Sequence, residues 1–107
     1  MQTITAPELA AWLANPERPD PMLLDVREAA EFAICQIPGA RLIPMNTVTA
    51  HLSELNEETE IVCICHHGGR SMQVASFLER QGFSKVINLT GGVHAWALQV
   101  DSSMPTY

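Results

Sequence analysis

Short apolar runs alternate along the chain with stretches in which apolar residues recur at helical spacing. The runs fall at residues 22–26, 41–43, 61–64 and 86–89. Runs of this length, rich in branched aliphatic residues, are typical of strands that are buried on both faces, as in a parallel sheet. We therefore predict strands at these four places.

Helical patterns fill the stretches between the runs. Thr5 and Glu8 have the spacing of a capping box, and the helix that they begin is predicted to end at Asn15-Pro16. Further helices are predicted over residues 27–34, from 46 or 47 to about 55, from 71 to 81 with Gly82 as terminator, and after the turn at 90–92. Strands that alternate with helices indicate an α/β domain with a mainly parallel sheet.

Composition and charge narrow the class of protein. A chain of 107 residues with 47% hydrophobic and 17% charged residues fits one globular domain, over residues 1–107 with an irregular tail at 101–107. The net charge of −6 argues against nucleic acid and anionic membranes as partners, and it requires any anion site to be local. The first residues resemble no secretory signal and no apolar run approaches a bilayer span, so we expect a cytoplasmic protein.

The three cysteines do not indicate a disulfide framework or a zinc site. Cys63 and Cys65 are expected on opposite faces of their strand, unable to share a metal. Cys35 is either a second redox thiol or an apolar filler of the core. We expect no metal and no organic cofactor.

The stretch from Cys65 to Ser71 carries the candidate chemistry. It follows the most hydrophobic predicted strand and leads into a predicted helix, with Gly68 and Gly69 between them. The first backbone N–H groups of a helix lack helical partners and, with the helix dipole, favour an anion. A cysteine at this position is predicted to be a reachable, reactive thiolate.

Three reactions use a cysteine in a backbone cradle: phosphate ester hydrolysis, arsenate reduction and sulfur transfer. A cysteine phosphatase loop needs arginine six positions after the cysteine. Here the sixth position is Ser71 and the arginine is Arg70, at the fifth. The shorter loop suits one added sulfur atom better than a phosphate group, so sulfur transfer is favoured.

Several separated segments support this interpretation by a family resemblance. They are Leu24-Asp25-Val26-Arg27-Glu28, Glu31-Phe32, Ile37-Pro38-Gly39-Ala40, the loop 65–71, Gly82-Phe83, Leu89-Thr90-Gly91-Gly92 and Ala95-Trp96. In this order and spacing they resemble a single-domain rhodanese, a sulfurtransferase. The resemblance implies a three-layer fold, with a five-stranded, mainly parallel sheet between helices on both faces, and a cysteine that cycles between thiol and persulfide.

The resemblance also assigns roles to residues. Cys65 would take sulfur from a small anionic donor such as thiosulfate, or from a persulfide, and pass it to cyanide or a thiol. The sulfur would be surrounded by the backbone amides of His66, His67, Gly68, Gly69 and Arg70. The side chain of Arg70 would add positive charge at the rim of this loop. Ser71 is expected to cap the helix and contact the sulfur, and the side chain of His67 either lines the rim or is solvent-exposed. Asp25 and Arg27 are expected to brace the neighbouring loops.

His66 departs from the pattern, because many thiosulfate-using members have arginine directly after the cysteine. A mostly neutral histidine removes one permanent positive charge from the rim. Thiosulfate is therefore expected to be a weak donor, and a persulfide, including one on a partner protein, a better one. The alternative function is a sulfur carrier that passes persulfide sulfur between proteins with little small-molecule turnover.

Overall fold

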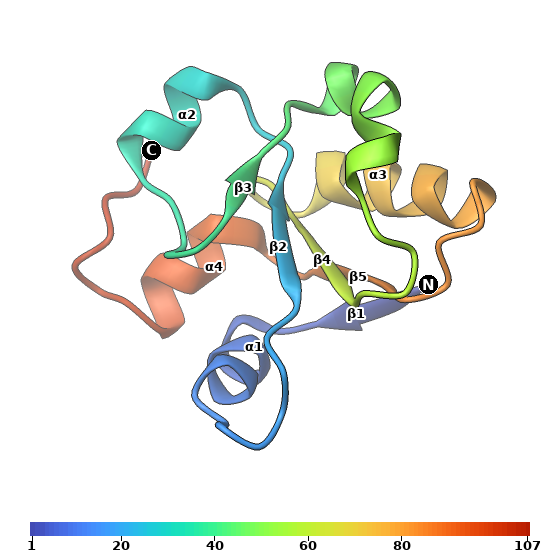
Figure 1. Ribbon diagram of the computed structural model, residues 1–107. Coiled ribbons are helices and arrows are strands. Elements are labelled where there is room, and N and C mark those ends of the chain that lie inside the picture. Colours follow the sequence, from blue (N-terminus) through green and yellow to red (C-terminus); the bar gives the residue numbers. More distant parts are fainter.

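A five-stranded parallel sheet runs through the centre of the computed structural model, which describes residues 1–107 (Figure 1). Its strands lie in the order β1-β5-β4-β2-β3, and every neighbouring pair is parallel. The strands are β1 (Gln2–Ile4), β2 (Met22–Asp25), β3 (Arg41–Leu42), β4 (Ile61–Ile64) and β5 (Val86–Leu89). The predicted α/β class, with five strands and helices on both faces, is confirmed.

Strand β1 is the one that the hydrophobic pattern missed. It lies at the edge of the sheet, where Thr3 pairs with Asn88 of β5. Gln2 and Thr3 are exposed and Ile4 is half-buried. An edge strand of three residues has no long apolar run, because one side of it faces solvent.

Five helical segments connect the strands: α1 (Ala6–Leu13), α2 (Ala29–Ile34), η1 (Met45–Glu54), α3 (Gly69–Arg80) and α4 (Gly92–Gln99). The predicted capping box is present, with Glu8 N–H donating to Thr5 Oγ1 at 3.3 Å and Thr5 N–H donating to Glu8 Oε1 at 2.9 Å. Gly82 has the left-handed φ of +98° predicted for the C′ position, two residues after the last residue of α3. The segment η1 is a 3₁₀ helix, and three successive β-branched residues at 47–49 disfavour a longer α-helix there.

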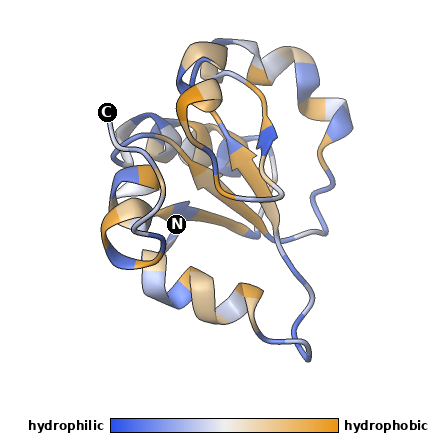
Figure 2. Ribbon diagram, turned by 90° about the vertical axis from the view of Figure 1, so that its left-hand side faces the viewer, coloured by the Kyte–Doolittle hydropathy of each residue, from blue (hydrophilic) through white to orange (hydrophobic).

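Two apolar clusters cover the two faces of the sheet. The central strands between them are coloured mostly as hydrophobic in Figure 2. Val62 and Ile64 pack with α1 and α4, whereas Ile61 and Cys63 pack with α3 and η1. Cys65 belongs to the same cluster as Cys63. The prediction that these cysteines lie on opposite faces was wrong, because residues two apart in a strand share a face.

The loops that follow β2, β4 and β5 meet at the carboxyl edge of the sheet, where ligands bind in parallel α/β folds (Figure 1). The tail after α4 contains no helix or strand and crosses this end of the molecule towards α2 (Figure 1). None of the helices has the length and apolar character needed to cross a membrane.

Candidate active site

Cys65 lies directly after β4, with its sulfur facing the start of α3. Gly68 N–H donates to Cys65 Sγ at 3.0 Å, and Ser71 Oγ lies 3.3 Å from the same sulfur. Gly68 has a φ of +109°, a left-handed conformation that side chains disfavour, and this turn brings its N–H back to the sulfur. The cysteine is thus held by the first residues of α3.

Helix α3 begins at Gly69, two residues before the predicted start. Gly68, and not Ser71, is its N-cap. The buried Ser71 hydroxyl donates to Asn88 Oδ1 at 2.5 Å, and Asn88 Nδ2 donates to the carbonyl of Gly68 at 3.2 Å. Asn88 was not predicted as a site residue, although a polar residue within the apolar run of β5 is a signal of such a role.

Further backbone N–H groups of this loop donate no hydrogen bond within the protein, among them those of His66, His67, Gly69 and Arg70. Unpaired N–H groups at the start of a helix, together with the helix dipole, favour a small anion. The backbone of the loop can therefore stabilise negative charge on a sulfur atom bonded to Cys65.

Arg70 does not present a free positive charge. Its Nη1 donates to Glu31 Oε1 at 2.7 Å, and its Nη2 donates to Glu31 Oε2 at 2.8 Å. This bidentate pair lowers the pKa of Glu31 to about 2. The positive charge predicted for Arg70 at the rim of the loop is compensated by a carboxylate from α2, a pairing that the sequence did not predict.

Asp25 and Arg27 form a fully buried ion pair at the end of β2. Arg27 Nη2 donates to Asp25 Oδ2 at 2.7 Å and to the carbonyl of Cys35 at 2.7 Å. Arg27 Nη1 donates to the hydroxyl of Tyr107 at 3.0 Å. The pair therefore joins the loop after β2, the segment after α2 and the C-terminal tail.

Tyr107 lies over the loop that follows Cys65. Its ring stacks on His66, with centroids 3.8 Å apart and planes tilted by 9°, and its hydroxyl donates to Glu31 Oε2 at 2.9 Å. Burial, and next the nearby His67, lower the pKa of His66, which keeps the ring neutral near pH 7. The sequence assigned no role to Tyr107.

Cys65 itself is 1% exposed. The sequence predicted a reachable thiol, and the structure corrects this expectation, because the residue is almost fully buried. A reactant would reach Sγ only after neighbouring groups move.

The other two cysteines lie in the core. Burial raises the pKa of Cys63 to about 12, so this thiol stays protonated. Cys35 packs in the cluster on the α1 and α4 side of the sheet, with its sulfur 3.8 Å from Arg27 Nη1. Cys65 packs in the other cluster, an arrangement that favours the filler role of Cys35 over that of a second redox thiol.

Comparisons with known proteins show the family to which the chain belongs. A family model described as Rhodanese-like domain matches residues 5–99. A protein of Allochromatium vinosum named Sulfurtransferase is 38% identical over 94 residues, which are 88% of this chain and 86% of that protein. The putative sulfur carrier protein YrkF of Bacillus subtilis is 46% identical over 74 residues, which are 69% of this chain but 40% of that longer protein.

A solved structure gives the same result for the fold. The crystal structure of a rhodanese-like domain protein from Staphylococcus aureus has a TM-score of 0.85 and 34% sequence identity. The match covers 100% of this chain and 99% of that one.

Proposed function

Because the chain belongs to the rhodanese-like domain family of sulfurtransferases and sulfur carriers, we propose that it transfers a sulfane sulfur through a persulfide on Cys65. The observation that carries the proposal is the cradle around Sγ. Gly68 N–H already donates to the sulfur, and the neighbouring N–H groups of the loop are unpaired. These groups would stabilise the terminal sulfur of a persulfide anion.

The proposed reaction has two steps. The Cys65 thiolate attacks the outer sulfur of thiosulfate; a new S–S bond forms, the sulfur–sulfur bond of the donor breaks, and sulfite leaves. With a persulfide donor the same attack releases the donor's thiolate. The terminal sulfur of the Cys65 persulfide then passes to a thiolate or cyanide, which restores the Cys65 thiolate.

The charges at the rim support a persulfide as the better donor. Arg70 is paired with Glu31, Arg27 is paired with Asp25, and His66 is neutral near pH 7. No guanidinium beside the loop is left to bind the dianion thiosulfate, and the chain as a whole carries a net charge of −6. Binding of a persulfide that is carried by a small thiol or a partner protein depends less on positive charge beside the loop.

The second candidate function is that of a sulfur carrier. Cys65 is buried and the charge of Arg70 is compensated by Glu31. Both features favour a partner protein that opens the site and delivers sulfur, and they disfavour turnover of free anions. In either role the three free cysteines fit a reducing compartment such as the cytoplasm.

Mass spectrometry of the intact chain tests the proposal. After treatment with thiosulfate or a small-molecule persulfide, the chain should gain the mass of one sulfur atom. Cys65→Ser should not gain it, and Cys63→Ala should behave like the wild type, because Cys63 is a buried, protonated thiol. An adduct that survives in Cys65→Ser, or no adduct with either donor, would overturn the mechanism.

Steady-state kinetics separate the two roles. A sulfurtransferase turns over thiosulfate or a small persulfide with cyanide or a thiol as acceptor. A carrier accepts sulfur rapidly from a persulfidated cysteine desulfurase but turns over these small molecules only slowly.

A further inference from the structure

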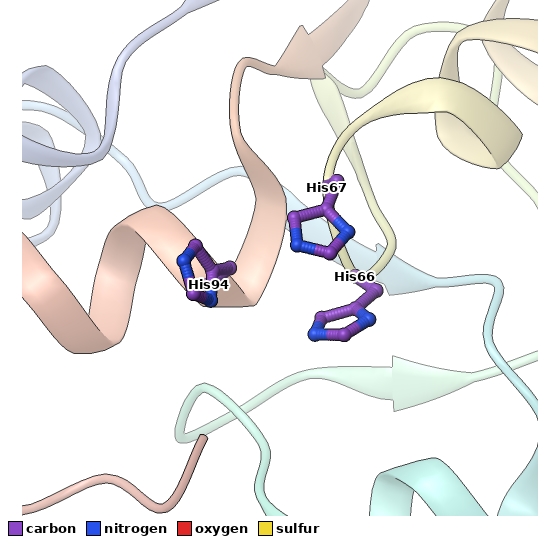
Figure 3. A group of neighbouring side chains, drawn as sticks. All are labelled: His66, His67 and His94. Carbon is purple, nitrogen blue, oxygen red and sulfur yellow. The ribbon is translucent and has the colours of Figure 1, made fainter. Parts of the chain in front are cut away.

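Three histidines converge beside the Cys65 loop. His66 and His67 come from the loop itself, and His94 lies beside them on the first turn of α4 (Figure 3). One ring nitrogen of each histidine lies within 4.8 Å of the corresponding nitrogens of the other two. The fourth histidine, His51, pairs with Glu54 elsewhere on the surface.

Backbone hydrogen bonds hold His94 and the loop together. Val93 N–H donates to the carbonyl of Cys65 at 2.9 Å, and His94 N–H donates to the carbonyl of His66 at 3.1 Å. Gly92 permits this approach, since a Cβ on this residue would overlap both carbonyl groups. The histidines are thus brought together by main-chain contacts that need no ligand.

Ring nitrogens of this cluster lack hydrogen-bonding partners within the protein. His66 Nε2 and His94 Nδ1 are buried without any partner. Such an unpaired buried nitrogen costs about 1–3 kcal/mol unless a ligand or water satisfies it. The lone pair of a neutral imidazole nitrogen is the group that binds a metal ion, and three imidazoles are gathered in this cluster.

We propose that His66, His67 and His94 form a binding site for a divalent transition-metal ion of the zinc type. Zinc binds histidine nitrogen at about 2.0–2.1 Å, which places tetrahedral ligand nitrogens about 3.4 Å apart. The present nitrogens lie within 4.8 Å of one another, so rotation of the side chains would have to bring them closer to reach this value; the ring of Tyr107 stacks on His66. Three protein ligands leave a fourth position open for water or an incoming ligand.

This site departs from the expectation of no metal, which rested on the cysteines. It is a histidine site, because the side chain of Cys65 packs on the α3 side of the sheet whereas His94 belongs to α4, on the other side. A bound ion would join the loop to α4 through its own ligands. The inference does not depend on sulfur transfer.

Zinc titration of the whole chain against a chromophoric chelator tests the proposal. The wild type should bind one Zn²⁺ per chain. Loss of an outer partner of a metal ligand already costs about 10–100-fold in affinity, so His94→Ala and His67→Ala should each weaken binding at least about tenfold. His51→Ala is the matched control and should bind like the wild type, and unchanged circular dichroism spectra would show that the variants fold.

Cys65→Ser distinguishes a histidine site from a thiolate site. It should keep the wild-type zinc affinity, and the Co²⁺ form of the wild type should lack a thiolate-to-metal charge-transfer band. Loss of zinc binding in Cys65→Ser, wild-type binding in His94→Ala, or no stoichiometric binding by the wild type would each overturn the proposal.

Discussion

Glu31 accepts hydrogen bonds from both terminal nitrogens of Arg70, at 2.7 and 2.8 Å, and so ties α2 to the loop that holds Cys65. The side chains are 20% and 34% exposed, so the pair is partly shielded from solvent. The positive charge of Arg70 is thereby compensated by the carboxylate of Glu31. This contact lowers the net positive charge at the rim of the loop, where we propose that the donor binds.

Removing the carboxylate should increase the use of thiosulfate. In Glu31→Gln the charge of Arg70 is no longer compensated, and we expect kcat/KM for thiosulfate to rise by about three- to tenfold, which corresponds to about 0.7–1.4 kcal/mol. Glu57→Gln, on the exposed turn before β4, removes one negative charge far from the loop and should leave the value unchanged. Equal gains in both variants would show that net charge, not the pair, controls donor use.

An arginine in place of His66 should act in the same direction. His66→Arg adds a permanent charge directly after the cysteine, where the present ring is neutral near pH 7. Steady-state assays should show a gain of about three- to tenfold in thiosulfate turnover. If turnover does not increase, the charge argument for a weak thiosulfate site fails.

The Glu31–Arg70 pair should make stability depend on acid pH. Folding lowers the pKa of Glu31 from 4.5 to about 2, because Arg70 favours the carboxylate. The stabilisation is therefore complete above pH 4.5 and is lost as the pH falls towards 2. Urea unfolding should show Glu31→Gln less stable than the wild type by about 1–2 kcal/mol at pH 7. The difference should be clearly smaller at pH 3, and a difference that is independent of pH would contradict this assignment.

The two cysteines around β4 should differ in reactivity. The pKa of Cys63 is raised to about 12 by burial, so very little thiolate exists at pH 8. Cys65 is also buried, but it lies in the loop after β4, so local opening should expose it more often than Cys63 within the strand. Iodoacetamide treatment of the folded chain, followed by peptide mass spectrometry, should therefore label Cys65 slowly and leave Cys63 unmodified. Labelling of Cys63 at the rate of Cys65 would refute the difference.

Gly92 should not tolerate a side chain. Its φ is +58°, and an added Cβ would overlap the carbonyls of Cys65 and His66, so Gly92→Ala should lower the free energy of unfolding by at least about 2 kcal/mol. Gly39→Ala is the matched control: its φ is +87°, but nothing lies within 4 Å of the added Cβ. It should cost only about 1 kcal/mol of backbone strain. Equal losses in denaturant unfolding would mean that the close approach is unimportant.

Local patterns in the sequence were sufficient for most of the fold. Four of the five strands, the Thr5 capping box and the left-handed Gly82 were predicted correctly, because burial and backbone preference leave their mark within a few residues. The position of Cys65 between a buried strand and a helix was also readable in this way.

Contacts between distant segments depended on the tertiary structure. The sequence identified Arg70 but not its pairing with Glu31, 39 positions away, and it identified His66 but not the convergence of His94 or the stack with Tyr107. Packing at one edge of the sheet produces three features: the pairing of Arg70 with Glu31, the burial of Cys65 and the convergence of three imidazoles. Spacing along a chain specifies local conformation, but only the folded backbone brings these side chains within reach of one another.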